Sequence, residues 1–389
     1  MPPLYRGLAV CSTLLCVLVA APHPARADGV LRTAINTGYE PALAGDFGGH
    51  GWVLVRADRE GALPRGARMS IEYNTDTLRL SIDRARFDRV ELGIGVVGEA
   101  ILAGVLTDYW RDGHEEGSHA FSASYVGAIG GAKVDLRPHY LEITAGARRW
   151  LFGRWTGTSP DLVLPPSAWV GELRMRYTYW KIAPDPSTYE AQRAFWRVRG
   201  VGFGLEVSGD LRSEAHAWGA IGPSFALTDP RNDPSRVVVG AHQWLRLGWQ
   251  VASRVRLQAR EEAHWMHGED DLDRQRIGGM NPYVVPLAGA PWPSYLSGKL
   301  LALEGSVHLR VKNQQELGML VDGVLTEDVR RVGATDARWL AGIGVFADLR
   351  LRGFQLDIRA GWSPTTQPGN HRGSGTLLVA IGWGGVRAR

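Results

Sequence analysis

The feature that most constrains this chain is a recurring alternation of apolar and polar residues with a period of two. From Phe354 to Trp362 every second residue is apolar, and the residues between them are Gln, Asp, Arg and Gly. The same alternation runs from Thr376 to Trp383. A period of two is the signature of a β-strand with two unlike faces. The polar face carries full charges, on segments of about the 9–11 residues that a tilted strand needs to cross a bilayer. The pattern therefore predicts an all-β protein, a transmembrane antiparallel β-barrel.

The N-terminus has the features of an exported protein. Arg6 precedes an apolar run over residues 8–21, and small residues at the spacing that a signal peptidase needs end the segment at Ala27. We expect residues 1–27 to be a cleaved signal peptide; an uncleaved anchor is the alternative. Both cysteines of the chain lie in this segment, so the mature chain would have no thiol and no need of oxidative folding.

Composition agrees with a barrel in an outer membrane. No stretch of about 18 or more apolar residues follows residue 27, so a closed barrel remains as the way to cross a membrane. The 49 Gly and 15 Trp suit coiled strands and membrane interfaces. With 44 Lys and Arg against 40 Asp and Glu, nothing indicates a nucleic-acid partner. We expect outer-membrane lipid and a protein or lipid client as partners, no cofactor, and the outer membrane of a Gram-negative bacterium as the location.

The alternation divides one domain, residues 51–384, into about 16 strands. Residues 28–50 are expected to be a short lead-in and residues 385–389 a tail. The expected strands are 51–58, 67–74, 76–84, 89–104, 118–129, 139–150, 168–180, 198–209, 214–224, 236–249, 254–266, 298–311, 315–323, 338–350, 353–363 and 374–384.

The connections between these strands alternate in length from residue 168 onward. The short ones are 210–213, 250–253, 312–314 and 351–352, and the long polar ones are 181–197, 226–235, 267–297, 324–337 and 363–373. Short turns on one rim and long loops on the other are typical of outer-membrane barrels, whose short turns are periplasmic. Before residue 168 the order of long and short connections is the reverse of the one expected, because 105–117 is long and 130–138 is short. The phase of the alternation is therefore wrong there. Either one segment is miscounted or residues 154–167 form an unusual connection.

The two faces of single strands are consistent with this interpretation. Between residues 301 and 312, Leu303, Val307 and Leu309 would face lipid, while Ser306 and His308 would face the lumen. An arginine on the lipid face costs about 2–4 kcal/mol at the bilayer midplane, so the register is strongly fixed. The lumen charges are mixed in sign, which favours ion pairs and a plugged or narrow interior over a selective pore: Glu172, Arg174, Arg176, Arg256, Arg260, Glu262, Glu304, Arg310, Asp357 and Arg359.

The sequence from Arg276 to Leu287, together with residues 301–310, resembles a particular place in a known barrel family. A Gly-Gly pair precedes a long loop, and five expected strands follow Gly279. This family is the bacterial surface antigen family, whose barrels of about 16 strands form outer-membrane protein assembly factors and two-partner secretion transporters. Residues 317–324 are similar to that family's aromatic-x-Asp-x-Gly strand, so the resemblance implies that Asp322 is the matching lumen acid. It covers residues 270–384 well and the rest only by pattern.

The chain departs from the family pattern in three places. The family's loop tip carries an Arg-Gly pair that enters the lumen and meets the strand acid, but residues 281–286 contain no Arg. The periplasmic client-binding repeats are lacking, and residues 384–389 replace the aromatic end that is usual for outer-membrane barrels. The resemblance therefore implies fold and location more than an assembly or secretion activity.

The long connection 267–297 is rich in proline and apolar residues, which is too apolar for simple exposure. We expect it to fold over or into the barrel mouth and close the lumen; a contact surface for another protein is the alternative. The candidate residues for lumen and loop closure are Arg276, Gly278, Gly279, Pro282, Tyr283, Glu304, Arg310, Asp322, Asp357 and Arg359.

Two acidic segments offer oxygen ligands of the kind that hard divalent cations prefer. They are Glu269, Asp270, Asp271 and Asp273 in one loop, and Asp108, Asp112, His114, Glu115 and Glu116 in another. Their spacing matches neither the calcium-binding loop nor the helical zinc motif, since no His-Glu-x-x-His occurs. Solvated extracellular loops are the simpler interpretation, and we assign no metal.

Some outer-membrane barrels are lipid hydrolases that use Ser and His. His242, and His308 with Ser306, are candidates, but the register places both histidines in the lumen and no nucleophile-elbow sequence is present. We assign no catalytic residue. The expected function is therefore a non-enzymatic barrel for translocation or assembly. A diffusion pore for small solutes and an outer-membrane lipid-modifying enzyme are the alternatives.

Overall fold

The fold was analysed in a computed structural model of the chain. It describes residues 30–40, 50–60, 63–74, 77–99, 106–107, 110–111, 114–115, 121–154, 158–181, 200–220, 234–270, 272–280, 285–290, 295–312, 315–327, 337–351, 354–366 and 373–388. The expected signal peptide, residues 1–27, lies outside this part of the chain. Among the residues described, no helix is long and apolar enough to cross a membrane.

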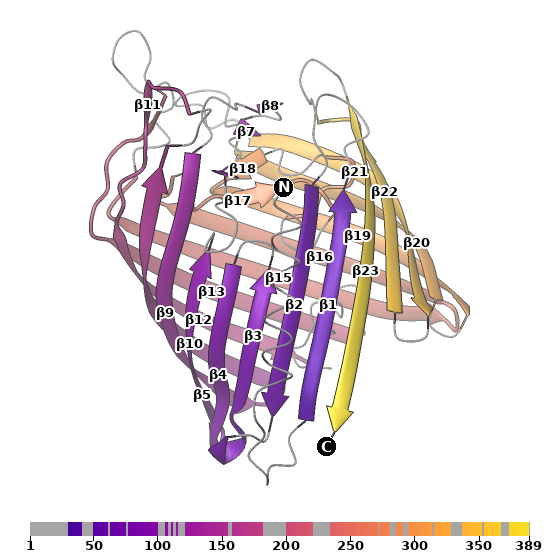
Figure 1. The fold of residues 1–389 in the computed structure, drawn as a ribbon. Helices are drawn as coiled ribbons and strands as arrows, with labels where there is room; N and C mark the ends of the chain where they lie inside the picture. Colours follow the sequence, from indigo (N-terminus) through magenta and orange to yellow (C-terminus); the bar gives the residue numbers. More distant parts are fainter. Residues whose placement is uncertain are drawn as a thin grey trace, which may run out of the picture.

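Sixteen long antiparallel strands form one closed β-barrel (Figure 1), as the alternation predicts. They are β1 (Val30–Glu40), β2 (His50–Glu60), β3 (Arg68–Asn74), β4 (Thr77–Phe87), β5 (Val90–Glu99), β9 (Phe121–Leu136), β10 (His139–Gly153), β12 (Trp169–Trp180), β13 (Gly200–Arg212), β15 (Val237–Ala252), β16 (Val255–His267), β19 (Lys299–Lys312), β20 (Gln315–Glu327), β21 (Ala337–Leu351), β22 (Phe354–Ser363) and β23 (Ser374–Ala388).

The barrel is closed by its first and last strands, which lie side by side in Figure 1. β1 pairs with β23 from Val30, opposite Ala388, to Tyr39, opposite Val379. The expected boundaries differ from this at both ends. The first strand lies within residues 28–50, where we expected a lead-in, and the last strand includes residues 385–388, which we expected to be a tail. Pairing between the two ends of the chain extends both strands.

The expected strand 214–224 is not a barrel strand. Residues 214–218 have no regular structure, and β14 (Gly219–Ala220) pairs with β11 (Leu162–Val163) in a separate two-stranded sheet. The apolar residue that suggested a strand, Trp218, is instead buried in a cluster of aromatic and aliphatic side chains at one rim, with Phe121 and Leu162. The count of sixteen is therefore right, although one of its members is replaced by β1.

The strand directions define two rims. Five connections of two residues lie on one rim, at 88–89, 137–138, 253–254, 313–314 and 352–353. Most long connections lie on the other, including 100–120, 213–236 and 268–298. Removal of the false strand 214–224 corrects the phase before residue 168. It also places the strand ends that residues 181–199 join on the short-turn rim, although we grouped this connection with the opposite loops.

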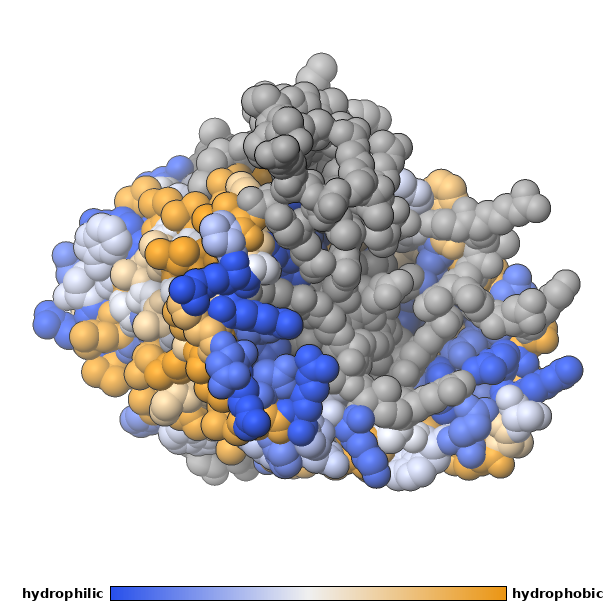
Figure 2. Space-filling model, turned by 90° about the horizontal axis from the view of Figure 1, so that it is seen from below, coloured by the Kyte–Doolittle hydropathy of each residue, from blue (hydrophilic) through white to orange (hydrophobic). Residues whose placement is uncertain are grey.

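The outer face is apolar and the inner face polar, as the alternation predicts. On β19 the side chains of Leu303, Val307 and Leu309 are 43–46% exposed, whereas Ser306 and His308 are 7% and 6% exposed. Seen from the short-turn end, hydrophobic residues cover much of the left flank of the molecule, and hydrophilic residues gather toward the middle of the view (Figure 2). An apolar belt of this kind suits contact with lipid.

Ion pairs between strands, adjacent or one strand apart, satisfy many of the inner charges. Arg148 of β10 contacts Asp210 at 3.1 Å and Glu172 at 3.5 Å. Farther round the barrel, Arg256 of β16 contacts Glu316 of β20 at 2.7 Å. The mixed signs along the lumen therefore pair with one another, as we expected.

Candidate functional site

The connection between β16 and β19 folds back on itself before it reaches the barrel wall. Its two ends form β17 (Gln275–Ile277) and β18 (Tyr295–Ser297), which pair with each other. Gly278 and Gly279 follow β17 with φ values of 124° and 79°, a conformation that glycine adopts without strain. Beyond them, the Val285 N–H donates to the Arg276 carbonyl at 3.0 Å, and the Gly279 N–H to the Ala290 carbonyl at 2.7 Å. The Gly-Gly pair thus lets the loop make a compact unit.

The tip of this loop lies against the inner face of the barrel. A buried backbone N–H group needs a hydrogen-bond acceptor from the protein, because no bulk water is present to accept the bond. Three strands provide these acceptors from their inner faces. The hydrogen bonds run from Ala288 to the Asp322 carboxylate of β20 at 2.8 Å, from Gly289 to the Thr376 hydroxyl of β23 at 3.2 Å, and from Met280 to the Glu40 carboxylate of β1 at 2.8 Å.

Glycines in the wall allow the loop to come this close. A Cβ atom at Gly342 of β21 would lie 2.2 Å from the Ala288 carbonyl oxygen. One at Gly361 of β22 would lie 2.6 Å from the Gly289 nitrogen. Both distances are shorter than van der Waals contact, so any other residue at either position would push the loop away from the wall. Backbone therefore packs on backbone where the loop meets β21 and β22.

Asp322 faces the lumen and contacts the loop, which is the place that the family resemblance implies for it. Its partner is the backbone N–H of Ala288, whereas the family pattern has an arginine. Asp322 also ends a row of charges in adjacent register on four strands: Arg246 of β15, Arg260 of β16, Glu304 of β19 and Asp322 itself. The predicted residue Glu304 therefore sits directly beside Asp322.

Of the other predicted residues, some lie at the loop contact and others lie away from it. Gly278 and Gly279 belong to the loop contact, and the Arg276 side chain beside them is exposed. Arg310 lies six residues along β19 from Glu304, about 20 Å away at the usual rise of a strand. Asp357 and Arg359 form an ion pair of 2.8 Å with each other on β22. Pro282 and Tyr283 lie outside the described residues.

A second cluster in the lumen brings together the Ser and His that a hydrolase would need. Ser306 Oγ lies 3.1 Å from His308 Nε2, and His308 Nδ1 lies 3.3 Å from Glu316. Arg256 occupies the same Glu316 oxygen at 2.7 Å. The cavity beside the cluster is only about 10 Å³, room for about one water molecule. Because an acyl group does not fit there, these contacts are those of a packed polar network.

At the long-loop rim the acidic segment is not a solvated loop, contrary to our interpretation. Arg212 of β13 pairs with Asp270 at 2.9 Å and also contacts Asp273. Asp270 accepts a hydrogen bond from Trp218 Nε1 at 2.9 Å and is 1% exposed. Burial, together with the charge of Asp270, raises the pKa of Asp273 to about 7. The segment therefore fastens the start of the loop to the rim; Asp271 and the side chains of the second acidic loop lie outside the described residues.

Several residues of the loop contact were not found from the sequence. Glu40 was missed because its segment was not recognised as a strand. Thr376 was assigned to a strand, but a single Thr has no signal that marks it as a loop acceptor. The loop contributes main-chain groups at Ala288 and Gly289, and main-chain donors leave no trace in residue type. Only a strand pattern with inward glycines, as at Gly342, gives a hint of close approach.

Comparison with known proteins places the fold. No protein-family model matches the sequence, and no curated protein does. Among solved structures, BamA from Haemophilus ducreyi lacking POTRA domains 1–3 has a TM-score of 0.61 and 11% identity, with 92% of this chain and 71% of that chain covered. CdiB from Acinetobacter baumannii has a TM-score of 0.55 and 9% identity, with 91% of this chain covered. This chain spans 60% of the length of that CdiB.

CdiB from Escherichia coli is similar to the same degree, with a TM-score of 0.55, 10% identity, and 90% and 63% of the two chains covered. At these identities the likeness shows the fold alone. The class that the fold defines is a 16-stranded barrel of the outer-membrane type. Within that class, the resemblance to barrels such as BamA and CdiB, first suggested by the sequence around Gly279 and Asp322, is confirmed at the level of the fold.

Proposed function

We propose that this protein is a non-enzymatic barrel of the Gram-negative outer membrane that takes part in translocation or assembly of a protein or lipid client, and that its loop 267–297 closes the lumen. The observation that carries the proposal is the attachment of the loop tip to the inner face through Asp322, Thr376 and Glu40. A loop with buried hydrogen bonds to three strands obstructs free diffusion. Movement of a client would require those bonds to be released.

The location is supported by the apolar outer face and by the difference between the two rims. Outer-membrane barrels have an apolar belt, short periplasmic turns and longer extracellular loops. The rim with the two-residue turns would then be periplasmic, and the loop 268–298 would enter from outside. Fractionation tests this: the protein should be in the outer membrane and run faster on gels unboiled than boiled. An unshifted band in the soluble periplasm would contradict the proposal.

Conductance in planar bilayers tests the closed lumen. The unaltered protein should give small, flickering currents, and deletion of residues 281–293 should give larger and steadier ones. Gly342→Ala should act in the same direction without shortening the chain, because its Cβ atom would meet the Ala288 carbonyl oxygen at 2.2 Å. Gly305→Ala on the outer face of β19 is the matched control, since no atom lies within 4 Å of its added Cβ.

The outcomes separate the proposal from the simplest alternative. Steady currents in the unaltered protein that the deletion leaves unchanged would mean that the loop does not close the lumen and would indicate a diffusion pore. If the loop does close the lumen, photo-crosslinking from loop positions in intact cells should capture a client. If the protein released fatty acid from phospholipid and Ser306→Ala abolished that release, the protein would be an enzyme. The packed environment of Ser306 argues against this outcome.

A further inference from the structure

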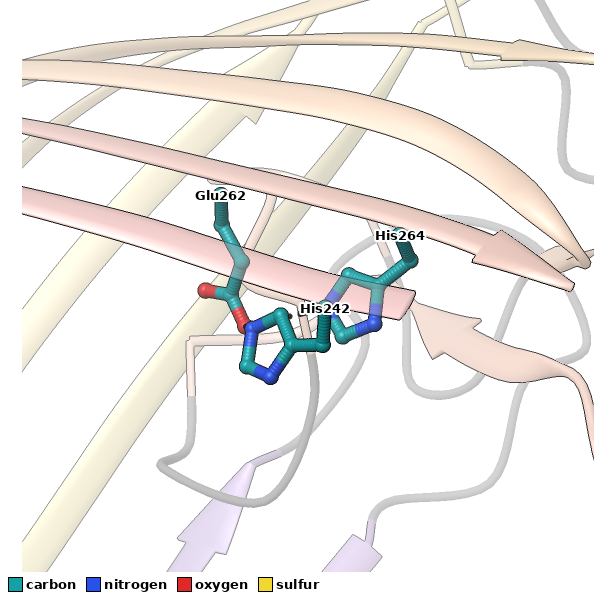
Figure 3. Close-up of side chains that lie close together, drawn as sticks. All are labelled: His242, Glu262 and His264. Atoms are coloured by element: carbon teal, nitrogen blue, oxygen red, sulfur yellow. Dashed lines mark hydrogen bonds and ion pairs between the residues drawn. The ribbon is translucent and has the colours of Figure 1, made fainter. Parts of the chain in front are cut away.

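Three side chains outside the loop contact converge on the inner wall of β15 and β16. His242 and His264 lie directly opposite each other in the strand register, and Glu262 precedes His264 by two residues on the same face. Their ligand atoms all lie within 4.8 Å of one another. Figure 3 shows that the three side chains lie close together and point toward one another.

The carboxylate of Glu262 divides its two oxygens between two kinds of partner. Oε1 lies 3.1 Å from Nε2 of His242 and 3.1 Å from Nε2 of His264. Oε2 faces two arginines: it is 3.6 Å from Arg246, and it also contacts Arg260. A carboxylate that binds a metal through one oxygen commonly has its other oxygen held by a hydrogen-bond donor, which fixes the ligand's orientation. Glu262 has this arrangement.

We propose that His242, Glu262 and His264 form a binding site for a divalent transition-metal ion such as Zn²⁺. Two ligand atoms that are each about 2.1 Å from one ion lie about 3.4 Å apart at the tetrahedral angle, close to the two 3.1 Å separations here. Two imidazoles and one carboxylate leave a fourth position for water or another ligand, as in zinc sites that keep an open coordination position.

Binding requires one ring to turn. The two imidazoles are stacked, with centroids 4.0 Å apart and planes 11° apart, and a ring nitrogen binds metal through a lone pair in the ring plane. The side chain of His242 is 29% exposed, against 8% for His264, so His242 has the room to rotate. The same exposure gives an ion access from the lumen.

The surrounding charge can accept a dication despite the two arginines. Arg246 and Arg260 are adjacent in register, and the row continues through Glu304 and Asp322. Together with Glu262, this gives three carboxylates to two guanidinium groups. Another carboxylate, Glu206 of β13, is opposite His242 in the register but binds Arg176. The metal ligands are therefore the two histidines and Glu262.

Zn²⁺ titration of the untagged, refolded chain from residue 28 onward, which contains neither cysteine, tests the site, with binding followed by competition against a chromophoric chelator. One ion per chain should bind, and excess Mg²⁺ should not displace it, because Mg²⁺ prefers oxygen ligands. His242→Ala, His264→Ala and Glu262→Gln should each weaken binding by about tenfold or more. His267→Ala is the matched control, since that exposed histidine ends the same strand outside the cluster.

Folding is controlled separately by the mobility shift on boiling. If His264→Ala or Glu262→Gln fails to fold, His242→Ala decides the question, because its side chain is the most exposed of the three. Affinity should also fall in acid, where protons compete for the imidazoles. No saturable binding by the folded protein, or equal affinity in His242→Ala and the unaltered chain, would overturn the site.

Discussion

The Asp322 carboxylate accepts the Ala288 N–H in a part of the lumen that is closed to bulk water, where a hydrogen bond to a charged group contributes about 1.5–3 kcal/mol. Asp322→Ala should therefore raise the population of the displaced loop about 10- to 100-fold. Asp322→Asn should have a smaller effect, because the amide oxygen can accept the same bond. Bilayer conductance reports both. Equal currents in Asp322→Ala and the unaltered barrel would show that this bond does not hold the loop.

Asp322 also shows how far residue type predicts a site. Its inward position follows from strand alternation, and its place in the loop contact follows from the family resemblance. Its partner does not follow from either, because Ala288 contributes a backbone group and any residue except proline has one. Likewise, nothing in the sequence around Thr376 indicates that its hydroxyl accepts a hydrogen bond from the loop. Sequence thus predicts the acid and the loop, and only the folded chain shows how they meet.

At the long-loop rim, the raised pKa of Asp273 makes loop attachment depend on pH. Its carboxyl has a pKa of about 7 when folded and about 3.9 when unfolded. The folded state therefore holds the extra proton in this window, and the free energy of unfolding falls as pH rises from about 4 to 7. Asp273→Asn, which is always neutral, should lack this fall.

Urea unfolding at a series of pH values measures the effect. The difference in unfolding free energy, Asp273→Asn minus unaltered, should increase between about pH 4 and 7 and then level off. Taking the difference cancels the groups that titrate independently of Asp273. Asp161→Asn, at an exposed position in another loop, is the matched control for the loss of one carboxylate. A flat result for Asp273→Asn would show that its pKa is not raised.

At the scale of single strands, alternation predicts register well where the outer face is strongly apolar. β19 is such a case, with Leu303, Val307 and Leu309 outward. β1 was missed because its outward positions include Thr33 and Thr37, which weaken the contrast between faces. Segment 214–224 was wrongly predicted to be a strand for the opposite reason. Its apolar residue Trp218 is buried by packing among the loops and does not face lipid. Periodicity predicts that one face of a segment is removed from water. It does not predict whether lipid, the lumen or another loop covers that face.

Neighbouring glutamates on β16 should respond oppositely to the same substitution. Glu261 lies on the outer face, where its carboxylate accepts hydrogen bonds from Gln243 at 3.3 Å, and a carboxylate against lipid is unfavourable. Glu261→Leu should therefore raise the unfolding free energy in lipid vesicles by about 1–2 kcal/mol. Glu262→Leu should lower it by about 3–5 kcal/mol, because it removes the buried carboxylate that contacts Arg246 and Arg260. Urea unfolding from vesicles measures both, and shifts of the same sign would contradict the assigned faces.

For the whole molecule, the decisive contact joins residues from opposite ends of the chain. The expected count of sixteen strands was right because the missed β1 and the false strand at 214–224 offset each other. Closure was not visible in the sequence, since pairing of β1 with β23 depends on two segments that local patterns treat separately. Gly384 and Gly385 suggested the end of a strand, but in the barrel they lie opposite Ala34 and Thr33.

This pairing predicts the effect of shortening the C-terminus. Removal of residues 384–389 would take away the partners of Val30–Ala34, and each lost backbone hydrogen bond costs about 0.5–1.5 kcal/mol. The refolded truncated barrel should lose its fast-running gel form at a lower temperature than the full chain. Removal of Arg389 alone is the control, because the pairing with β1 ends at Ala388. If both truncations melt like the full chain, residues 384–388 are a tail, and the barrel closes without them.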